Sequence, residues 1–266
     1  MTPQPGDRGA PRLPWRAGRI FPWLERQRKS GPLHFTLLDP DKSPGATAGR
    51  VAREAERLGS HAILLGGSTG ITPALMGDAA RAVHEATSLP VIIFPQGPES
   101  ITREADALLF MSLMNSSDLK WVIRAQMQSS LGIRALGIEA ISLGYLIIEP
   151  GMKVGEVGRA EPVPRDDVAT ACGYAQAAEF LGMKLIYLEA GSGAPAPVPP
   201  AMVRAVRETV RSVLVVGGGI RRREDAAALL DAGADVLVTG TVVETDGVSA
   251  LQDIVAEVRK RRRPPS

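Results

Sequence analysis

The stretch Leu185–Gly193 reads Leu-Ile-Tyr-Leu-Glu-Ala-Gly-Ser-Gly, an apolar run that contains one carboxylate and then breaks into small residues. The pattern recurs twice downstream, where 213–216 ends in Gly217-Gly218-Gly219 and 236–238 ends in Thr239-Gly240-Thr241. Each run has the length of a buried strand, and each break exposes backbone N–H groups and hydroxyls. We therefore expect three strand ends that together grip an anion.

Eight such apolar runs alternate with helical segments: 33–38, 62–65, 91–94, 108–113, 145–148, 185–188, 213–216 and 236–238. Strands that are apolar on both faces and separated by helices are typical of a parallel sheet covered by helices. Eight units in about 250 residues match a (β/α)8 TIM barrel, and a doubly wound open sheet is the alternative. We prefer the barrel because residues suited to an active site follow nearly every strand: Asp39, Ser68, Asn115, Glu149, Glu189, Gly219 and Thr241.

The domain organisation predicted is one α/β domain over 15–262, preceded by a disordered leader over 1–14. A chain of 266 residues with 44% hydrophobic content can bury a core of this size. The segment 97–105 is short and begins beside prolines, so we expect a rudimentary helix after the third strand. A helix over 118–131 and a second short one near Gly137 are predicted before the fifth strand.

Composition narrows the function classes. The net charge of +2 is too small to indicate a nucleic-acid partner. The single cysteine, Cys172, excludes a disulfide framework. Because no apolar run approaches a membrane span and 1–14 lacks the apolar core of a signal peptide, we expect a soluble, cytoplasmic protein. Basic residues cluster near both ends, over 26–29 and 259–263, as solvated helix ends; peripheral contact with a membrane surface is the alternative.

The glycines at the ends of strands seven and eight predict a phosphate site. Gly218 and Gly219 follow the seventh strand, and Gly240 with Thr241 follows the eighth. These are the adjacent strands that hold phosphate in many barrels, because glycine lets backbone N–H groups approach an anion. The alternative, that the glycines only form tight turns, explains either pair alone better than both together.

Glu189 is the candidate catalytic residue. A carboxylate near the end of a buried strand needs a hydrogen-bond partner or a substrate hydroxyl. Tyr187 shares its strand face and Ser192 follows in the loop, so a polyol phosphate is a natural ligand. Glu189 would hold the hydroxyls and accept a proton from one of them. A structural ion pair is the alternative.

A sparse set of oxygen ligands for Mg²⁺ follows the first two strands. Asp39 and Asp41 end the first, and Ser68 and Thr69 end the second. Mg²⁺ is usually held by one or two carboxylates together with substrate phosphates and water. Asp41 serves equally well in capping the following helix, whereas Asp39 is harder to explain in that way.

Together these residues resemble the geranylgeranylglyceryl phosphate synthase family, including its bacterial heptaprenyl relatives. The resemblance runs in consistent order from about residue 33 to 244. It is carried by 34–42 (His-Phe-Thr-Leu-Leu-Asp-Pro-Asp-Lys), 66–69 (Gly-Gly-Ser-Thr), 111–116 (Met-Ser-Leu-Met-Asn-Ser), 144–145 with 149–151, 187–193, 217–220 and 239–241. The Leu-Glu-Ala-Gly-Ser-Gly segment places the sequence closer to the archaeal-type branch.

The resemblance implies a prenyltransferase of membrane ether-lipid biosynthesis. It would join a long prenyl diphosphate, geranylgeranyl diphosphate first, to sn-glycerol 1-phosphate through an ether and release diphosphate. It implies a homo-oligomer, either a dimer or a hexamer, with Mg²⁺ bound through Asp39 and Ser68. The prenyl chain would lie along residues between Phe110 and Trp121. Glycerol phosphate would contact Tyr187, Leu188, Glu189, Ala190, Gly191, Ser192, Gly193, Gly218, Gly219, Gly240 and Thr241.

One departure limits the resemblance. Some relatives carry a lysine two residues before the aspartate of strand one, where this chain has Leu37. A role for such a lysine does not carry over. Two other functions remain open at this stage: a barrel isomerase acting on a sugar phosphate, which needs an acid facing a base, and a non-catalytic binder of a small phosphometabolite.

Overall fold

The computed structural model describes residues 18–67, 70–241, 243 and 247–263. Eight parallel strands close into a barrel in chain order, with β1 paired to both β2 and β8. The strands are β1 (Leu33–Leu38), β2 (Ala62–Leu65), β3 (Val91–Ile93), β4 (Ala107–Leu113), β5 (Glu139–Ile147), β6 (Leu185–Glu189), β7 (Val213–Gly217) and β8 (Val236–Thr239). The predicted TIM barrel is confirmed and the open sheet is excluded.

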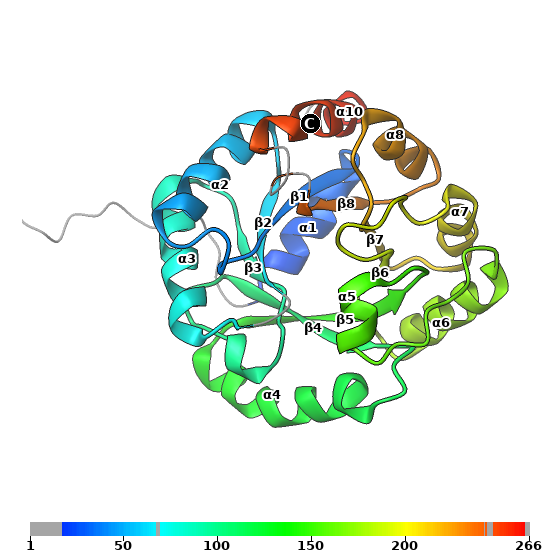
Figure 1. Ribbon diagram of the computed structural model, residues 1–266, viewed down its shortest axis with the longest axis horizontal. Coiled ribbons are helices and arrows are strands. Elements are labelled where there is room, and N and C mark those ends of the chain that lie inside the picture. The colour runs from blue at the N-terminus through cyan, green and yellow to red at the C-terminus, as the bar shows by residue number, and fades with distance from the viewer. Residues whose placement is uncertain (1–17, 68–69, 242, 244–246, 264–266) are drawn as a thin grey trace, which may run out of the picture.

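Helices surround the strands as a ring (Figure 1). The ring comprises α2 (Ala46–Leu58), α3 (Pro73–Ala86), α4 (Ala125–Leu136), α6 (Val168–Phe180), α7 (Pro200–Thr209), α8 (Arg223–Asp231) and α10 (Leu251–Lys260). The short helix α5 (Met152–Val157) lies inside the ring, beside β5 and β6 (Figure 1). Short turns of helix lie at η1 (Pro98–Ser100), η2 (Lys120–Arg124) and η3 (Val248–Ala250). The leader predicted over 1–14 lies outside the described residues.

The strand periodicity divides the apolar side chains into two cores. Alternate residues of each strand fill the barrel, where Phe35, Leu64 and Ile141 are almost fully buried. Their neighbours, such as Leu65 and Ile93, pack against the surrounding helices. Because most strand residues are covered on both faces, the strands are predominantly apolar, as is typical of a parallel sheet.

Helix α1 (Ile20–Lys29) closes the amino-terminal end of the barrel. Its Ile20 and Leu24 are buried in the inner core. Glu139, at the start of β5, accepts the N–H groups of Ile20 at 2.5 Å and Phe21 at 3.0 Å. A carboxylate is favourable there because it meets unpaired N–H groups and the positive end of the helix dipole. α1 thereby leaves only the carboxyl end of the barrel open.

Two local predictions need correction in this region. The fifth strand begins at Glu139 rather than at Tyr145, so the short helix expected near Gly137 is absent; Gly137 instead ends α4 in a left-handed conformation. The polar residues Glu139 and Ser142 hid the first half of the strand. The rudimentary helix expected after β3 is confirmed as the single turn η1.

Candidate active site

A polar pocket opens at the carboxyl ends of β6, β7 and β8. Leu37, Ile220, Arg221, Val238 and Thr239 contribute to its lining. Of the eleven residues that the sequence predicts for substrate binding, eight line the pocket: Tyr187, Glu189, Ser192, Gly193, Gly218, Gly219, Gly240 and Thr241. Leu188 and Ala190 pack instead in the outer core, and Gly191 contributes its backbone N–H to Glu189. The structure therefore brings the three predicted strand ends together.

Glu189 is the carboxylate at the floor of this pocket. Its side chain is 7% exposed, and its Oε1 accepts the N–H of Gly191 at 2.7 Å. Burial raises the pKa of Glu189, while hydrogen bonding from Gly191 and from the hydroxyls of Tyr187 and Tyr145 opposes that rise. A raised pKa brings a carboxylate closer to the proton affinity that a general base needs near neutral pH.

An aromatic wall supports Glu189. The rings of Tyr145 and Tyr187 lie 5.1 Å apart at 74°, and Phe94 meets them edge-on at 5.3 and 5.8 Å. The pairing of β5 with β6 sets Tyr145 directly beside Tyr187. Burial, followed by the nearby Glu189 charge, raises the pKa of both phenols well above its ordinary value, so both hydroxyls stay protonated and can donate.

Tyr145 was missed as a site residue by the sequence reasoning. Its signal was present, since a hydroxyl in an otherwise apolar strand needs a partner when buried. The sequence could not show that this partner is Glu189 on the next strand.

Two glycines in β7 and its loop allow this close packing. A β-carbon at Gly217 would overlap the Tyr187 hydroxyl, and one at Gly218 would overlap Glu189 Oε1. Gly218 also has a φ of +80°, which side-chain-bearing residues rarely adopt. The glycine run is therefore required by the tyrosine and the carboxylate, in addition to any role toward an anion.

Side chains from distant loops join across the pocket. Ser192 Oγ and Thr241 Oγ1 lie 2.7 Å apart and share a hydrogen bond. Arg221 Nη2 donates to the carbonyl oxygen of Gly193 at 3.1 Å. The loops after β6, β7 and β8 are thus tied to one another around the pocket.

The predicted metal site is described in part. Asp39 lies at the end of β1 with its side chain 12% exposed, next to Lys42 and against Gly67 at the end of β2. Asp41 is exposed and donates its backbone N–H to Asp39 Oδ1 at 3.1 Å. Ser68 lies outside the described residues. Within the described ranges no group of three or more His, Cys, Asp or Glu side chains could hold a metal.

Asn115, which the sequence also places at a strand end, is fully engaged by the backbone. Its amide nitrogen donates to the carbonyl oxygens of Ile147 and Glu161 at 2.9 and 2.8 Å, and its oxygen accepts the N–H of Ile147 at 3.2 Å. It therefore fixes the loop after β4 against β5.

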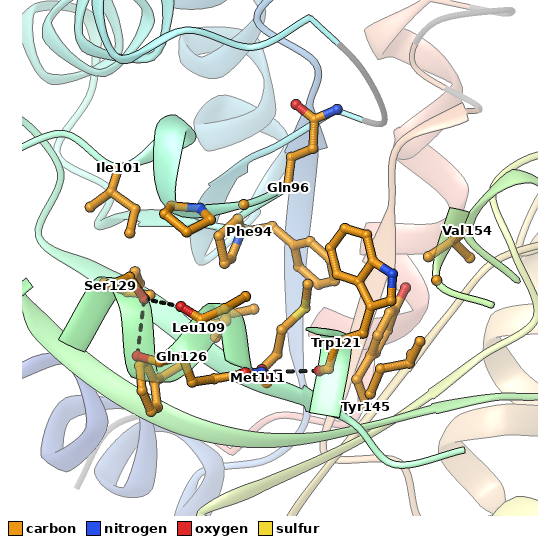
Figure 2. Close-up of a pocket in the computed structure, with 18 of the residues that line it drawn as sticks. Phe94, Gln96, Ile101, Leu109, Met111, Trp121, Gln126, Ser129, Tyr145 and Val154 are labelled. Carbon is orange, nitrogen blue, oxygen red and sulfur yellow. Dashed lines mark hydrogen bonds between the residues drawn. The ribbon is translucent and has the colours of Figure 1, made fainter. Parts of the chain in front are cut away.

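A long apolar pocket adjoins the same mouth. Figure 2 shows Trp121 and Tyr145 at one end and Ile101 with Ser129 at the other. Where a full helix would follow β3 in a regular barrel, this chain has only η1, and the pocket lies against η1, β4 and α4. Its lining carries no charged side chain: Gly67, Phe94, Pro95, Gln96, Gly97, Pro98, Ile101, Leu108, Leu109, Phe110, Met111, Leu113, Trp121, Ala125, Gln126, Ser129, Tyr145, Val154, Val157 and Gly158.

A π-helical turn, η2, presents Trp121 to this pocket. Such turns release carbonyl groups from the regular helical pattern and are often found at functional sites. Here Ser112 Oγ donates to the carbonyl of Val122 at 2.7 Å, and Gln126 Nε2 donates to the carbonyls of Trp121 and Met111. Side chains from β4 and α4 thus hold the wall of the pocket in place.

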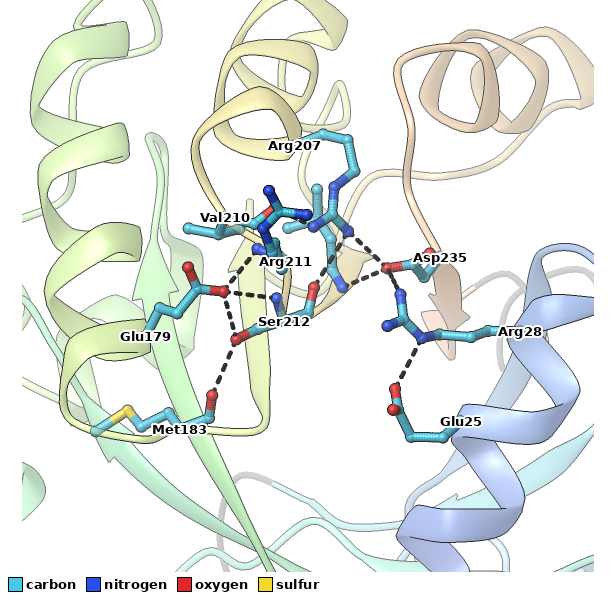
Figure 3. A network of polar contacts seen from close by, with 10 residues as sticks. Glu25, Arg28, Glu179, Met183, Arg207, Val210, Arg211, Ser212 and Asp235 are labelled. Carbon is cyan, nitrogen blue, oxygen red and sulfur yellow. Dashed lines mark hydrogen bonds and ion pairs between the residues drawn. The ribbon is translucent and has the colours of Figure 1, made fainter.

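A second polar cluster lies at the opposite end of the barrel (Figure 3). Asp235 accepts Arg207 Nη1 at 2.8 Å, Arg28 Nη1 at 3.5 Å and the N–H of Leu214 at 2.9 Å. Arg28 also pairs with Glu25 of α1. Because these charges pair with one another, we interpret the cluster as a structural anchor for α1 and look for the active site at the open end of the barrel.

Comparison with known families now adds to this geometry. The model of the PcrB family matches residues 23–258, which is most of the chain. The chain belongs to the PcrB family. This confirms the resemblance inferred from the strand-end motifs.

Two curated relatives of this PcrB-family chain carry the same name. The geranylgeranylglyceryl phosphate synthase of Thermococcus gammatolerans is 47% identical over 230 residues, covering 86% of this chain and 91% of the relative. That of Methanothermobacter thermautotrophicus is 47% identical over 233 residues, covering 88% and 93%.

Solved structures agree. The (S)-3-O-geranylgeranylglyceryl phosphate synthase of Thermoplasma acidophilum, solved in complex with substrate sn-glycerol-1-phosphate, has a TM-score of 0.87 and 43% identity. The match covers 91% of this chain and 98% of that structure.

Proposed function

We propose that this chain is a prenyltransferase that joins sn-glycerol 1-phosphate to a long prenyl diphosphate, with geranylgeranyl diphosphate the first candidate. An ether bond forms between the glycerol hydroxyl and the allylic carbon, and diphosphate leaves. The observation that carries the proposal is that an apolar pocket and a polar pocket are neighbours: Tyr145 lines the apolar one, and its ring packs against Tyr187, which lines the polar one together with Glu189. The named relatives support the same reaction.

The polar pocket is assigned to glycerol phosphate. Backbone N–H groups in the loops after β6, β7 and β8 would hold the phosphate, helped by the hydroxyls of Ser192 and Thr241. Glu189 and Tyr187 lie deeper, where they would meet the glycerol hydroxyls. This order places the charged end of the acceptor toward solvent and its reacting hydroxyl toward the apolar pocket.

Glu189 is assigned as the general base. As the acceptor oxygen bonds to the allylic carbon and the carbon–oxygen bond to diphosphate breaks, the hydroxyl proton passes to Glu189. The tyrosine hydroxyls and the Gly191 N–H hold the carboxylate in position for this transfer.

Asp39 and Ser68 are assigned to Mg²⁺. The Asp39 carboxylate beside Gly67 suits a cation that takes most of its ligands from diphosphate and water. When bound, Mg²⁺ would neutralise negative charge on the diphosphate. Asp39 would fix its place near the entrance of the apolar pocket, whose lining includes the same Gly67.

The apolar pocket disfavours the two alternatives. An isomerase of a sugar phosphate needs no uncharged pocket lined by twenty residues, and neither does a binder of a small phosphometabolite. A prenyl chain needs such a pocket because each methylene removed from water contributes about 0.8 kcal/mol.

An exposed apolar face along η2 and α4 is a candidate surface for the predicted oligomer. Leu119, Ile123, Met127 and Leu131 are more than half exposed and recur every four residues along one helix face. Contiguous apolar surface of this kind marks an interaction site. We assign it to self-association, with peripheral membrane contact as the alternative. No described helix is long and apolar enough to cross a bilayer, and a cytoplasmic location stays a prediction.

The test is a transfer assay with radiolabelled geranylgeranyl diphosphate and sn-glycerol 1-phosphate, in Mg²⁺ and in EDTA. The expected result is Mg²⁺-dependent transfer that is selective for the 1-phosphate over the 3-phosphate. Binding of glycerol phosphate without transfer from prenyl donors of any length would favour the binding-protein function instead.

A further inference from the structure

Three consecutive arginines follow β7, and their side chains take different directions. Arg222 pairs with Asp225 at 3.2 Å, and Arg223 pairs with Glu257 at 2.7 Å. Arg221 alone of the three lines the polar pocket. Its guanidinium makes no ion pair with any residue in the described ranges, and its one hydrogen bond there is to the carbonyl oxygen of Gly193.

The backbone of Arg221 is fixed while its side chain stays available. Its N–H donates to Asp225 Oδ2 at 3.2 Å, as does that of Arg222, which ties the start of α8. A guanidinium has five N–H donors, and the bond to Gly193 uses only one. The remaining donors lie at the rim of a pocket that the loops after β6 and β8 complete.

The charges in the described lining of the polar pocket favour an anionic ligand. Among the lining residues Glu189 is the anion and Arg221 is the cation. Glu189 is occupied at the floor by Gly191 and the tyrosines, so it leaves the cation unmatched. A phosphate monoester brings about 1.5 to 2 negative charges at pH 7, which neutral backbone N–H groups can orient but cannot neutralise.

We propose that Arg221 binds the phosphate group of the acceptor and sets the preference of the polar pocket for a charged acceptor. The inference rests on the proposed function, since it takes glycerol phosphate as the occupant of this pocket. Arg221 contributes a charge-assisted hydrogen bond to a phosphate oxygen, which is stronger than a neutral one. Its bond to Gly193 ties the side chain to the loop after β6, beside the proposed phosphate position.

The experiment compares Arg221→Met and Arg221→Lys with the matched control Arg222→Met, whose side chain points away from the pocket. Isothermal titration calorimetry gives the Kd of each for sn-glycerol 1-phosphate and for inorganic phosphate. Arg221→Met should bind both anions about 10- to 100-fold more weakly, because a hydrogen bond to a charged group is lost. Arg221→Lys should lose less, since it keeps the charge, and Arg222→Met should bind as the parent chain does.

Kinetics separate binding from a structural role. The KM for glycerol phosphate should rise in Arg221→Met while kcat at saturation and the KM for prenyl diphosphate stay near the parent values. An unchanged Kd for both anions overturns the proposal, as does an equal loss in Arg221→Met and Arg221→Lys, which would assign Arg221 to loop structure. If the parent chain binds inorganic phosphate but transfers no prenyl group, the proposed function fails while Arg221 is still tested by phosphate binding.

Discussion

Replacing Glu189 by Gln removes the charge of the assigned base while keeping its size. The amide oxygen can still accept the N–H of Gly191, which Glu189 Oε1 now accepts at 2.7 Å. Because this bond lies within the chain and does not involve the ligand, its change from charge-assisted to neutral should leave the affinity for glycerol phosphate almost unchanged. Loss of general-base catalysis costs about 10²- to 10⁴-fold in kcat. We therefore expect a large fall in kcat and at most a small rise in the Kd for glycerol phosphate.

Stability should move in the opposite direction to activity. Burial raises the pKa of Glu189, which means that the folded chain disfavours the charged form relative to the unfolded chain. Gln carries no charge at any pH, so the Tm of Glu189→Gln at pH 7 should be equal to or above that of the parent. An inactive variant that was also less stable would indicate a structural role for the carboxylate.

The pH profile supplies a further check. A general base works only when ionised, so kcat/KM of the parent should fall as the pH drops through the raised pKa of Glu189. Single-turnover transfer assays between pH 4.5 and 8 measure this limb, which Glu189→Gln should lack. Glu156→Gln, a change to an exposed carboxylate on α5, is the matched control. Near-parent kcat in Glu189→Gln, with unchanged glycerol phosphate affinity, would refute the assigned role.

Three further predictions concern other parts of the molecule. Ser129→Phe places a large side chain in the apolar pocket and should raise the KM for geranylgeranyl diphosphate roughly tenfold, since overpacking costs about 1–3 kcal/mol. The Kd for glycerol phosphate should stay unchanged, and a change in that Kd would argue against separate pockets. Burial lowers the pKa of His34 from 6.5 to about 3, so as the pH falls the unfolded chain binds a proton before the folded chain does. The free energy of unfolding should therefore fall by up to about 1.4 kcal/mol per pH unit below pH 6.5. Urea titrations at pH 6.5 and 5 measure this change, and equal free energies at the two pH values would contradict the prediction. Met127→Glu puts a charge on the exposed apolar face and should reduce the mass measured by light scattering to that of a 28.2 kDa monomer. If the parent chain is already a monomer and sediments with anionic vesicles, the face is a membrane contact instead.

Much of the site was predictable because its parts are local in sequence. An apolar run with a carboxylate at its end, as at Glu189, can be recognised without a structure. So can glycines after two successive strands, as at Gly218 and Gly240. The proposed metal ligand Asp39 was found in the same way, from a polar residue that directly follows a strand.

The missed features depend on contacts between distant segments. The first half of β5 contains Glu139, which suits a strand only because α1 places its unpaired N–H groups against that carboxylate. Tyr145 joins the site only because the register of β5 on β6 sets it beside Tyr187. Residues 221–223 are all arginine, so the sequence gives no reason to single out one of them. Only their contacts in the folded chain distinguish Arg221 from its neighbours.

The amino-acid pattern alone was enough to predict the apolar strands, the order in which strands and helices alternate, and the residues that follow each strand. Those properties depend on side-chain periodicity and on the conformational freedom of glycine, both of which act over a few residues. The folded structure was needed to see that an apolar pocket lies beside the single turn η1, and that its Tyr145 packs against Tyr187 of the polar pocket. A pocket is a volume enclosed by side chains from separate strands, and the barrel's closure and register, which act over the whole chain, determine which side chains share it.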